Sequence, residues 1–307
     1  MTRLALVGAG RWGRQLLRVF DPRCRVAQVC HRGSPETRAW LARHHPHVPV
    51  ATDYAAVLRA QDIEAVVIAT PIATHAALAR SALEADKHVF VEKPMATNPG
   101  EAGELVGLAA SRRRVLFVGH VFLYHPVLER IRQLTADDRV RFAAMSWRKL
   151  GTFEEDLFWN LVSHEVAIAA ALFGERPTDA EVLEAQGVVT ACDIASIRLM
   201  FEGGRGCVMA VNRCGSSRSK QVTLVTERGR VLAWDEDRLL RLTPERAWES
   251  VETGGEEPLA LEAEAFLKRV GAGEPSAPGS VSGALVVEVI DRLLAARRGN
   301  APVPVAP

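Results

Sequence analysis

Short apolar runs alternate with amphipathic stretches along the first 120 residues. The runs are nearly continuous in apolar side chains, which is typical of parallel strands covered on both faces. We predict strands over residues 4–7, 25–30, 65–70, 88–91 and 115–118. Helices are expected up to residue 20 and over residues 76–83 and 100–111. Strands and helices in alternation predict a doubly wound parallel sheet of the α/β class.

The pattern changes after residue 119. Helices are predicted over residues 126–134 and 160–173, with a strand over residues 139–148 between them, and two more helices are expected to close the chain. Short strand-like runs separated by Gly, Asp, Asn and Ser lie in between, which indicates a mostly antiparallel sheet. These runs are residues 181–189, 194–201, 206–211, 221–226 and 230–234. We therefore predict two domains: residues 1–120 with a parallel sheet, and residues 121–307 of the α+β type with an open, mostly antiparallel sheet.

Composition restricts the classes of function. Apolar residues make up 48% of the chain and charged residues 24%, as in an ordinary globular protein. The net charge is +1 and no basic run suggests nucleic-acid recognition, so neither a nucleic acid nor a membrane surface is expected as a partner. The number of cysteines is odd, at 5, and none of them form a close metal-ligand pair. We expect a reduced, cytoplasmic protein.

A glycine motif follows the first predicted strand directly and opens the first predicted helix. It reads Gly8-Ala9-Gly10-Arg11-Trp12-Gly13. The first glycine permits a tight turn, the second lets the backbone approach a pyrophosphate, and the third lets helix and strand pack closely. The anion would lie on exposed N–H groups at the positive end of the helix dipole. Because the motif lies between a strand and a helix, it predicts a dinucleotide-binding Rossmann domain.

The end of the second predicted strand bears on the choice of cofactor. An NAD site usually has an acidic residue there to hold the ribose 2′-hydroxyl, and this chain has none. His31, Arg32 and Ser34 stand there instead and could surround a 2′-phosphate, since an arginine fork matches phosphate geometry. Alternatively, Arg32 is solvated or stacks on the adenine. We expect NADP or NAD, with NADP slightly favoured.

Two further strand ends carry candidate chemistry. Thr70-Pro71 ends one strand and precedes His75, and Glu92-Lys93-Pro94 ends the next. The carboxyl ends of parallel strands are where ligands bind in such sheets. A lysine there could polarise a substrate oxygen or move a proton. The alternative is a surface lysine in an ordinary ion pair with Glu92.

Asn160 and His164 form a second candidate, one turn apart on a predicted helix that is otherwise largely apolar. An imidazole held by an amide can accept a hydroxyl proton near neutral pH. The alternative is a hydrogen-bonded structural histidine. His44, His45 and His47 resemble a metal cluster, but they lie at a helix end beside Pro46, where we expect a solvated face and no metal site.

Together these motifs, with Gly119-His120 before Tyr124-His125-Pro126, resemble the glucose–fructose oxidoreductase / inositol dehydrogenase / MocA (Gfo/Idh/MocA) family. Within it, the stretches over residues 118–126 and 160–174 are most similar to a short bacterial branch that includes UDP-N-acetylglucosamine 3-dehydrogenases. The resemblance is specific up to about residue 127 and weak beyond residue 177.

The resemblance implies roles for these residues. Lys93 would touch both the nicotinamide ribose and the reacting hydroxyl, and His164 would serve as general base or acid. The expected catalytic residues are Lys93, His164 and Asn160. The expected cofactor-binding residues are Gly8, Gly10, Arg11, Trp12, Gly13, His31, Arg32, Ser34, Thr70, Pro71, His75, Glu92, Lys93 and His120. The expected substrate-binding residues are Lys93, Tyr124, Asn160 and His164.

The chain also departs from the family. Asn160 stands where the family usually has an aspartate, and Leu123 stands near a position that is polar in many relatives. An asparagine can orient an imidazole but cannot supply negative charge to stabilise an imidazolium. The acid after the second strand is missing as well.

The resemblance implies reversible oxidation of a secondary alcohol on a sugar, nucleotide sugar or cyclic polyol. Other chemistry on the same fold is a second hypothesis: an NAD-retaining glycosidase or an imine reductase. A third is a non-catalytic nucleotide-binding regulator, since fold alone does not decide function. The family further implies that the open sheet face mediates oligomerisation, so a homodimer or homotetramer is expected.

Overall fold

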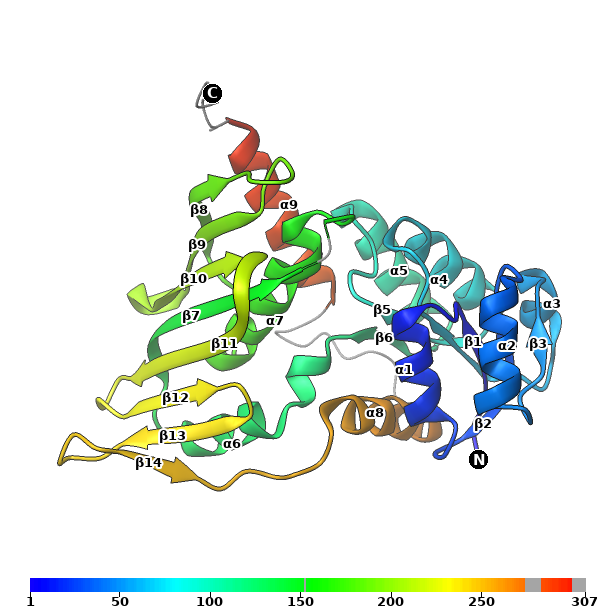
Figure 1. Cartoon of the computed structure of the whole chain (residues 1–307), viewed down its shortest axis with the longest axis horizontal. Helices are drawn as coiled ribbons and strands as arrows, with labels where there is room; N and C mark the ends of the chain where they lie inside the picture. Colours follow the sequence, from blue (N-terminus) through cyan, green and yellow to red (C-terminus); the bar gives the residue numbers. More distant parts are fainter. Residues whose placement is uncertain (152, 274–282, 300–307) are drawn as a thin grey trace. The chain divides into compact units, whose positions relative to one another are not determined.

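The computed structural model describes residues 1–151, 153–273 and 283–299. The chain divides into two compact units. The first unit comprises Met1–Val121 and Glu257–Val287, and the second comprises Phe122–Glu256 and Glu288–Pro307. Figure 1 labels their helices and strands along the chain.

The first unit contains a six-stranded sheet in the order β3-β2-β1-β4-β5-β6, in which every neighbouring pair is parallel. Its strands are β1 (Arg3–Val7), β2 (Arg25–Cys30), β3 (Val50–Ala51), β4 (Ala65–Ile68), β5 (His88–Glu92) and β6 (Leu116–Gly119). The helices between them are α1 (Arg11–Phe20), α2 (Pro35–His44), α3 (Tyr54–Arg59), α4 (His75–Glu84) and α5 (Pro99–Ser111), with a short 3-10 turn η1 (Ile72–Thr74). This arrangement confirms the predicted doubly wound parallel sheet.

The central strands of this sheet are buried because helices cover both faces. All four residues of β4 are buried, as the run of apolar side chains predicted. Helix α5 begins where the Asn98 side chain accepts hydrogen bonds from the N–H groups of Gly100 and Glu101.

Helix α8 (Pro258–Ala272) belongs to the first unit, although we predicted that every residue after 120 lies in the second domain. Its Phe266 ring packs edge-on against Phe20 of α1, Phe90 of β5 and Phe117 of β6, with centroids 5.6–6.1 Å apart. The packing of these buried rings holds α8 against the parallel sheet. From the sequence, the apolar face of α8 predicts that the helix packs against a sheet, but it does not indicate which of the two sheets.

The second unit contains an eight-stranded sheet in the order β14-β13-β12-β11-β7-β10-β9-β8. All neighbouring pairs are antiparallel except β7 and β10, which run parallel. The strands are β7 (Val140–Leu150), β8 (Asp179–Gln186), β9 (Ile194–Met200), β10 (Gly206–Asn212), β11 (Cys214–Thr226), β12 (Val231–Asp235), β13 (Arg238–Leu242) and β14 (Trp248–Val251). The predicted mostly antiparallel sheet is confirmed.

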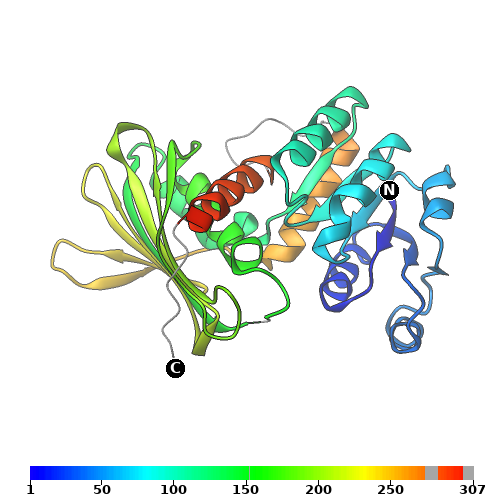
Figure 2. The same ribbon diagram turned by 90° about the horizontal axis from the view of Figure 1, so that it is seen from above.

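Helices lie against one face of this sheet, and the other face carries no helix (Figure 2). The remaining helical elements are the 3-10 turns η2 (Val121–Tyr124) and η4 (Glu202–Gly204), α6 (Pro126–Leu134), the π-helical turn η3 (Phe158–Val162), α7 (Ser163–Phe173) and α9 (Gly283–Gly299). Helix α9 belongs to the second unit from Glu288 onward. Strand β7 alternates accordingly, since Ala143, Met145 and Trp147 are buried while Phe142 and Ala144 are exposed. Helix α7 is buried nearly all round.

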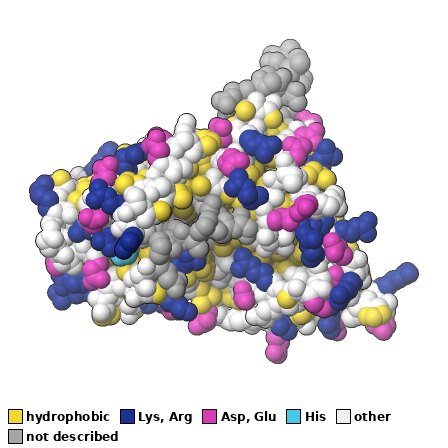
Figure 3. Space-filling model, turned by 180° about the vertical axis from the view of Figure 1, so that it is seen from behind, with side chains coloured by type: hydrophobic (Ala, Val, Ile, Leu, Met, Phe, Trp, Pro, Cys, Tyr) yellow, Lys and Arg dark blue, Asp and Glu magenta, His cyan; other side chains and the backbone are white. Residues whose placement is uncertain are grey.

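Among the described residues, no helix is long and apolar enough to cross a membrane. Positive and negative side chains are interspersed on the face shown in Figure 3, in keeping with the small net charge of +1.

Candidate active site

The turn after β1 is so tight that two of its positions have no room for a side chain. Gly8 has a φ of +94°, and a Cβ there would lie 2.4 Å from the carbonyl oxygen of Ala69. A Cβ on Gly13 would lie 2.1 Å from the oxygen of Gly8, whereas a Cβ on Gly10 would meet nothing within 4 Å. Gly8 and Gly13 therefore serve the turn and the packing of α1, and the backbone at Gly10 stays open to an approaching ligand.

The strand ends that follow this turn meet at one edge of the sheet. In the parallel register, Val7 pairs with Cys30 on one side and with Ile68 on the other, and Ile68 pairs with Val91. The loops that begin after β1, β4, β5 and β6 carry Gly8, Thr70, Lys93 and His120. The structure thus brings the predicted residues of the first unit to a common edge, where parallel sheets bind ligands.

At the end of β2, the predicted residues have different surroundings. The His31 ring accepts a hydrogen bond from the N–H of Gly33 at 3.0 Å, and its buried Nε2 has no hydrogen-bond partner within the described part of the chain. Arg32 is exposed. Ser34 caps α2, since its Oγ accepts from the N–H of Thr37 and donates to the Glu36 carboxylate.

The sequence analysis missed Arg38 at this position. A Cβ on Gly33 would lie 3.0 Å from a guanidinium nitrogen of Arg38, so the side chain of Arg38 folds back over the loop. Burial, and then the positive charge of Arg38, lower the pKa of His31 below its usual range. An arginine four residues after the N-cap is a weak signal in the sequence. Only the fold of the loop places its side chain beside the end of β2.

Glu92 is a buried carboxylate rather than a surface ion-pair partner. It is 7% exposed, and its Oε1 accepts a hydrogen bond from Nε1 of Trp12. Burial raises the pKa of Glu92 to about 7, although the Trp12 hydrogen bond and the charge of Lys93 act in the opposite direction. The motif at the end of β5 is thereby tied to the first turn of α1.

His75 ties two strand ends together. Its Nδ1 lies 2.8 Å from the carbonyl oxygen of Pro94, and its Nε2 lies 2.7 Å from that of Thr70. The ring is 1% exposed. These contacts give His75 a role in the loops after β4 and β5, and its predicted contact with the cofactor stays a prediction.

His120 is held uncharged at the end of β6. It is 3% exposed, and neither ring nitrogen has a hydrogen-bond partner within the residues described. Burial and the charge of Lys93 lower the pKa of His120 to about 3. A neutral imidazole with two unused nitrogen atoms beside Lys93 is suited to hydrogen-bond a ligand.

The predicted pair in the second unit lies on two kinds of helix. Asn160 is in the π-helical turn η3, and His164 is in the first turn of α7. We predicted one continuous helix over residues 160–173, whereas the structure has a π-helical turn up to Val162 and the α-helix from Ser163. π-Helical turns are rare and frequent at functional sites.

Aromatic rings surround His164. Its centroid lies 5.2 Å from Phe122 at an interplanar angle of 89°, and 5.5 Å from Trp147 at 62°. Phe122 also packs near Trp234, whose ring lies 4.8 Å from His125. Tyr124, the other predicted substrate residue of this unit, is half-buried at the end of η2.

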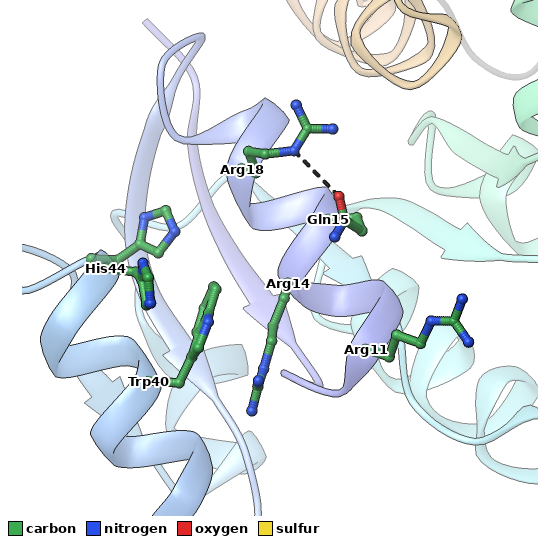
Figure 4. A pocket seen from close by; sticks show the side chains of 7 residues that line it. Arg11, Arg14, Gln15, Arg18, Trp40 and His44 are labelled. Atoms are coloured by element: carbon green, nitrogen blue, oxygen red, sulfur yellow. Dashed lines mark hydrogen bonds between the residues drawn. The ribbon is translucent and has the colours of Figure 1, made fainter.

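Two hollows in the first unit lie beside α1. The larger, of about 630 Å³, lies between α1 and α2 and is lined by Arg11, Arg14, Arg18, Trp40 and His44 among others (Figure 4). The smaller, of about 330 Å³, includes Arg11 and Trp12. Of the predicted cofactor residues, Arg11 and Trp12 line these hollows.

The histidines near the end of α2 have a partner that the sequence analysis overlooked. One carboxylate oxygen of Asp21 lies 2.6 Å from Nδ1 of His45, and the other lies 2.9 Å from Nε2 of His47. The expectation of a solvated face was therefore wrong for His45, which is half-buried. These three side chains are close enough to share an ion, but each carboxylate oxygen is already hydrogen-bonded to an imidazole.

Comparison with known proteins agrees with this geometry. Residues 2–120 match the profile of the oxidoreductase family with an NAD-binding Rossmann fold, Gfo/Idh/MocA. UDP-N-acetylglucosamine 3-dehydrogenase of Acidithiobacillus ferrooxidans is 27% identical over 228 residues, which are 69% of this chain and 67% of that protein. A dTDP-3,4-didehydro-2,6-dideoxy-alpha-D-glucose 3-reductase of Saccharopolyspora spinosa is 32% identical over 135 residues, but the match spans only 43% of this chain and 40% of that relative.

Solved structures share this fold over nearly the full length of the chain. The Acidithiobacillus ferrooxidans dehydrogenase superposes with a TM-score of 0.87 at 24% identity, covering 96% of this chain and 97% of that one. A levoglucosan dehydrogenase in complex with NADH superposes with a TM-score of 0.84 at 17% identity, covering 99% and 100%.

Fold and site together define an oxidoreductase with an NAD-binding Rossmann domain. More narrowly, residues 2–120 match the Gfo/Idh/MocA family of oxidoreductases through its Rossmann domain. The family resemblance predicted from the motifs is confirmed.

Proposed function

We propose that this protein is an NAD(P)-dependent dehydrogenase or reductase that interconverts a secondary alcohol and a ketone on a sugar, with a nucleotide-linked sugar as the favoured substrate. The observation that carries the proposal is the position of Lys93. It directly follows β5, at the edge of the parallel sheet where the open glycine turn lies, and beside the neutral imidazole of His120.

The residues at this edge fit a nicotinamide dinucleotide. The backbone at Gly10 is open where a pyrophosphate would approach the N-terminus of α1. The unpartnered nitrogen atoms of His31 and His120 offer hydrogen bonds near opposite ends of the row of strand ends. When bound, the nicotinamide accepts or supplies the hydride.

The chain's own residues handle the proton and the reacting oxygen. Lys93 donates a hydrogen bond to the substrate oxygen and draws electron density from it. His164 accepts the hydroxyl proton during oxidation and returns it during reduction. Asn160 orients the substrate or the imidazole without adding charge.

The names of the sequence relatives support the substrate class. One is a 3-dehydrogenase of a UDP-linked sugar and another is a 3-reductase of a dTDP-linked sugar. A nucleotide-linked hexose with a reacting hydroxyl at position 3 is therefore the first substrate to test.

The first test replaces Lys93 with alanine. We expect turnover of UDP-N-acetylglucosamine, or of another nucleotide sugar that the wild type oxidises, to fall about 10²-fold or more, the range for a lost acid–base group. Lys268→Ala is a matched control, since it removes the same charge from an exposed position on α8. NADH or NADPH absorbance reports the rate. Near-normal turnover in a folded Lys93→Ala protein would contradict this role.

We propose NADP as the preferred cofactor, with Arg32 and Arg38 at the 2′-phosphate. Titration followed by nicotinamide fluorescence is expected to give at least about tenfold tighter binding of NADPH than of NADH, and Arg32→Ala should remove most of that difference. Arg43→Ala, at an exposed position of α2, is the control. Glu36 lies close to Ser34 and would repel a phosphate, so tighter binding of NADH would overturn this choice and assign the ribose to Glu36.

A further inference from the structure

A buried ion pair adjoins the candidate proton acceptor in the second unit. Glu165 follows His164 on α7, and its Oε1 accepts a hydrogen bond from Nζ of Lys220 on β11. The two side chains are 1% and 3% exposed. The other oxygen, Oε2, has no hydrogen-bond partner among the residues that the structure describes.

Lys220 and His164 share two aromatic neighbours. The Lys220 ammonium lies 4.6 Å from the ring centroid of Phe122 and 4.2 Å from that of Trp147. The His164 ring lies 5.2 Å and 5.5 Å from the same two centroids. A cation over an aromatic face is attracted to it, most strongly where water is excluded. The ammonium therefore helps to fix the rings against which the imidazole packs.

Burying such a pair is expensive for the fold. Both ions lose their hydration, and apolar residues of similar volume are often equally or more stabilising. Burial also lowers the pKa of Lys220, while Glu165 acts to raise it. A role beyond stability would explain why two charges lie at this position.

We propose that Lys220 and Glu165 are positioning residues for His164, holding its imidazole through Phe122 and Trp147 and tuning it for proton transfer where Asn160 supplies no charge. This inference rests on the proposed function, in which His164 moves the substrate proton. Lys220 is the member of the pair that shares rings with the imidazole, whereas the side chain of Glu165, at the next helical position, faces another direction.

Other charged groups around the pair belong to neighbouring strands. Glu236 accepts a hydrogen bond from the main-chain N–H of Lys220. The charge of Glu236 raises the pKa of Lys220, and the charge of Arg218 lowers it. The pKa of His125 is lowered mainly by burial and also by the charge of Lys220. Asp237, 3.3 Å from His125, acts in the opposite direction. These groups stay in place in the variants below, so the comparison isolates the pair.

The test is the double variant Lys220→Met/Glu165→Gln, which removes both charges at similar volume and leaves no ion unpaired. We expect a folded protein whose kcat is at least about tenfold lower, less than the roughly 10²-fold or greater loss of an acid–base group because His164 itself is retained. Loss of the ammonium favours the imidazolium, and loss of the carboxylate disfavours it. Because the ammonium shares two aromatic rings with the imidazole, we expect its loss to dominate, so the acidic limb of the pH–kcat profile should lie about half to one pH unit higher. The exposed pair Arg241→Met/Glu249→Gln provides the matched control in the same unit.

Titration of His164 itself separates this inference from the proposed function. Histidine labelled at Cε1, assigned with His164→Gln, is followed by NMR in the wild type and the double variant, with no substrate required. A higher midpoint in the variant supports the inference even if no nucleotide sugar turns over. An unmoved midpoint overturns it, whether or not kcat falls, because a merely structural pair leaves the imidazole's proton affinity unchanged. If the double variant does not fold, Phe122→Leu removes one shared ring and leaves both charges. An unchanged His164 midpoint and kcat in that variant would also overturn the inference.

Discussion

Glu262 illustrates how a single residue can link the core to pH. It lies on α8 with 0% exposure, and neither carboxylate oxygen has a hydrogen-bond partner within the residues described. Burial, and then the charge of Glu92, raise its pKa well above the ordinary value of 4.5. Glu92 itself has a pKa of about 7. Two carboxyl groups that influence each other in a dry core are neutral in part or in full at neutral pH.

The sign of the resulting pH dependence is fixed. Both groups bind a proton in the folded protein at pH values where the unfolded chain has released it. The contribution of these two groups to stability is therefore fully present below about pH 4.5 and is lost as the pH rises toward about 7 and beyond. Each proton contributes a slope of about 1.4 kcal/mol per pH unit over that window.

Glu262→Gln should flatten this dependence. The amide keeps the volume but has no charge to lose, so we expect the variant's melting temperature to exceed that of the wild type at pH 8 and to approach it at pH 5. Calorimetric scans at pH 5, 6, 7 and 8 measure the difference. Glu264→Gln, two residues along the same helix and 53% exposed, is the control. Equal pH dependence in wild type and Glu262→Gln would show that Glu262 is not protonated in the fold.

Some residues of the site could be recognised in the sequence because their type alone carries the chemistry. The glycines of the turn and Lys93 at a strand end are of this kind. Arg38, Glu165, Glu262 and Lys220 are not, since they act through neighbours that tertiary packing supplies. Nothing local marks a lysine of β11 as a partner for the residue after His164, 55 positions earlier in the chain.

At the scale of elements, apolar runs were predicted well and polar elements were missed. Helix α6 and strand β2 have the expected bounds, because both have clear apolar patterns and clear ends. The sequence analysis expected a helix end near His44 but gave no bounds for α2, in which Leu41 is the only buried residue, and it did not predict α3, which is six residues long. It also missed β13 and β14, the latter with no buried position. Elements that bury little leave a weak periodic signal.

The strand bounds also show why catalytic loops are easier to predict than their geometry. Strand β4 ends at Ile68, two residues before the predicted end, so Thr70 lies in the loop that His75 fastens. The turn that contains Asn160 has π-helical rather than the expected α-helical geometry. In both cases the residues were found, and their precise orientation depends on contacts made by other segments.

At the scale of the whole molecule, the uncovered face of the second unit's sheet is the remaining feature to be explained. Ala144 lies at its centre, paired with Val208 on β10 and Thr223 on β11. Ala144 is exposed, and Phe142, 44% exposed, lies on the same face. Small and apolar side chains at the centre of this face are well suited to flat packing against a second copy, which would form a closed, isologous interface.

We therefore propose a homodimer or homotetramer through this face, as the family resemblance implied. Light scattering after size exclusion should give two or four times the chain mass of 33.5 kDa. Ala144→Arg is expected to reduce the mass to that of one chain, because a buried unpaired charge at the centre of an interface is strongly unfavourable. Lys268→Glu, on the exposed side of α8, should keep the assembly. A monomeric wild type, or an Ala144→Arg protein of unchanged mass, would exclude this face as the interface. In the first case the apolar side chains on this face need another explanation, and in the second the copies associate through a different surface.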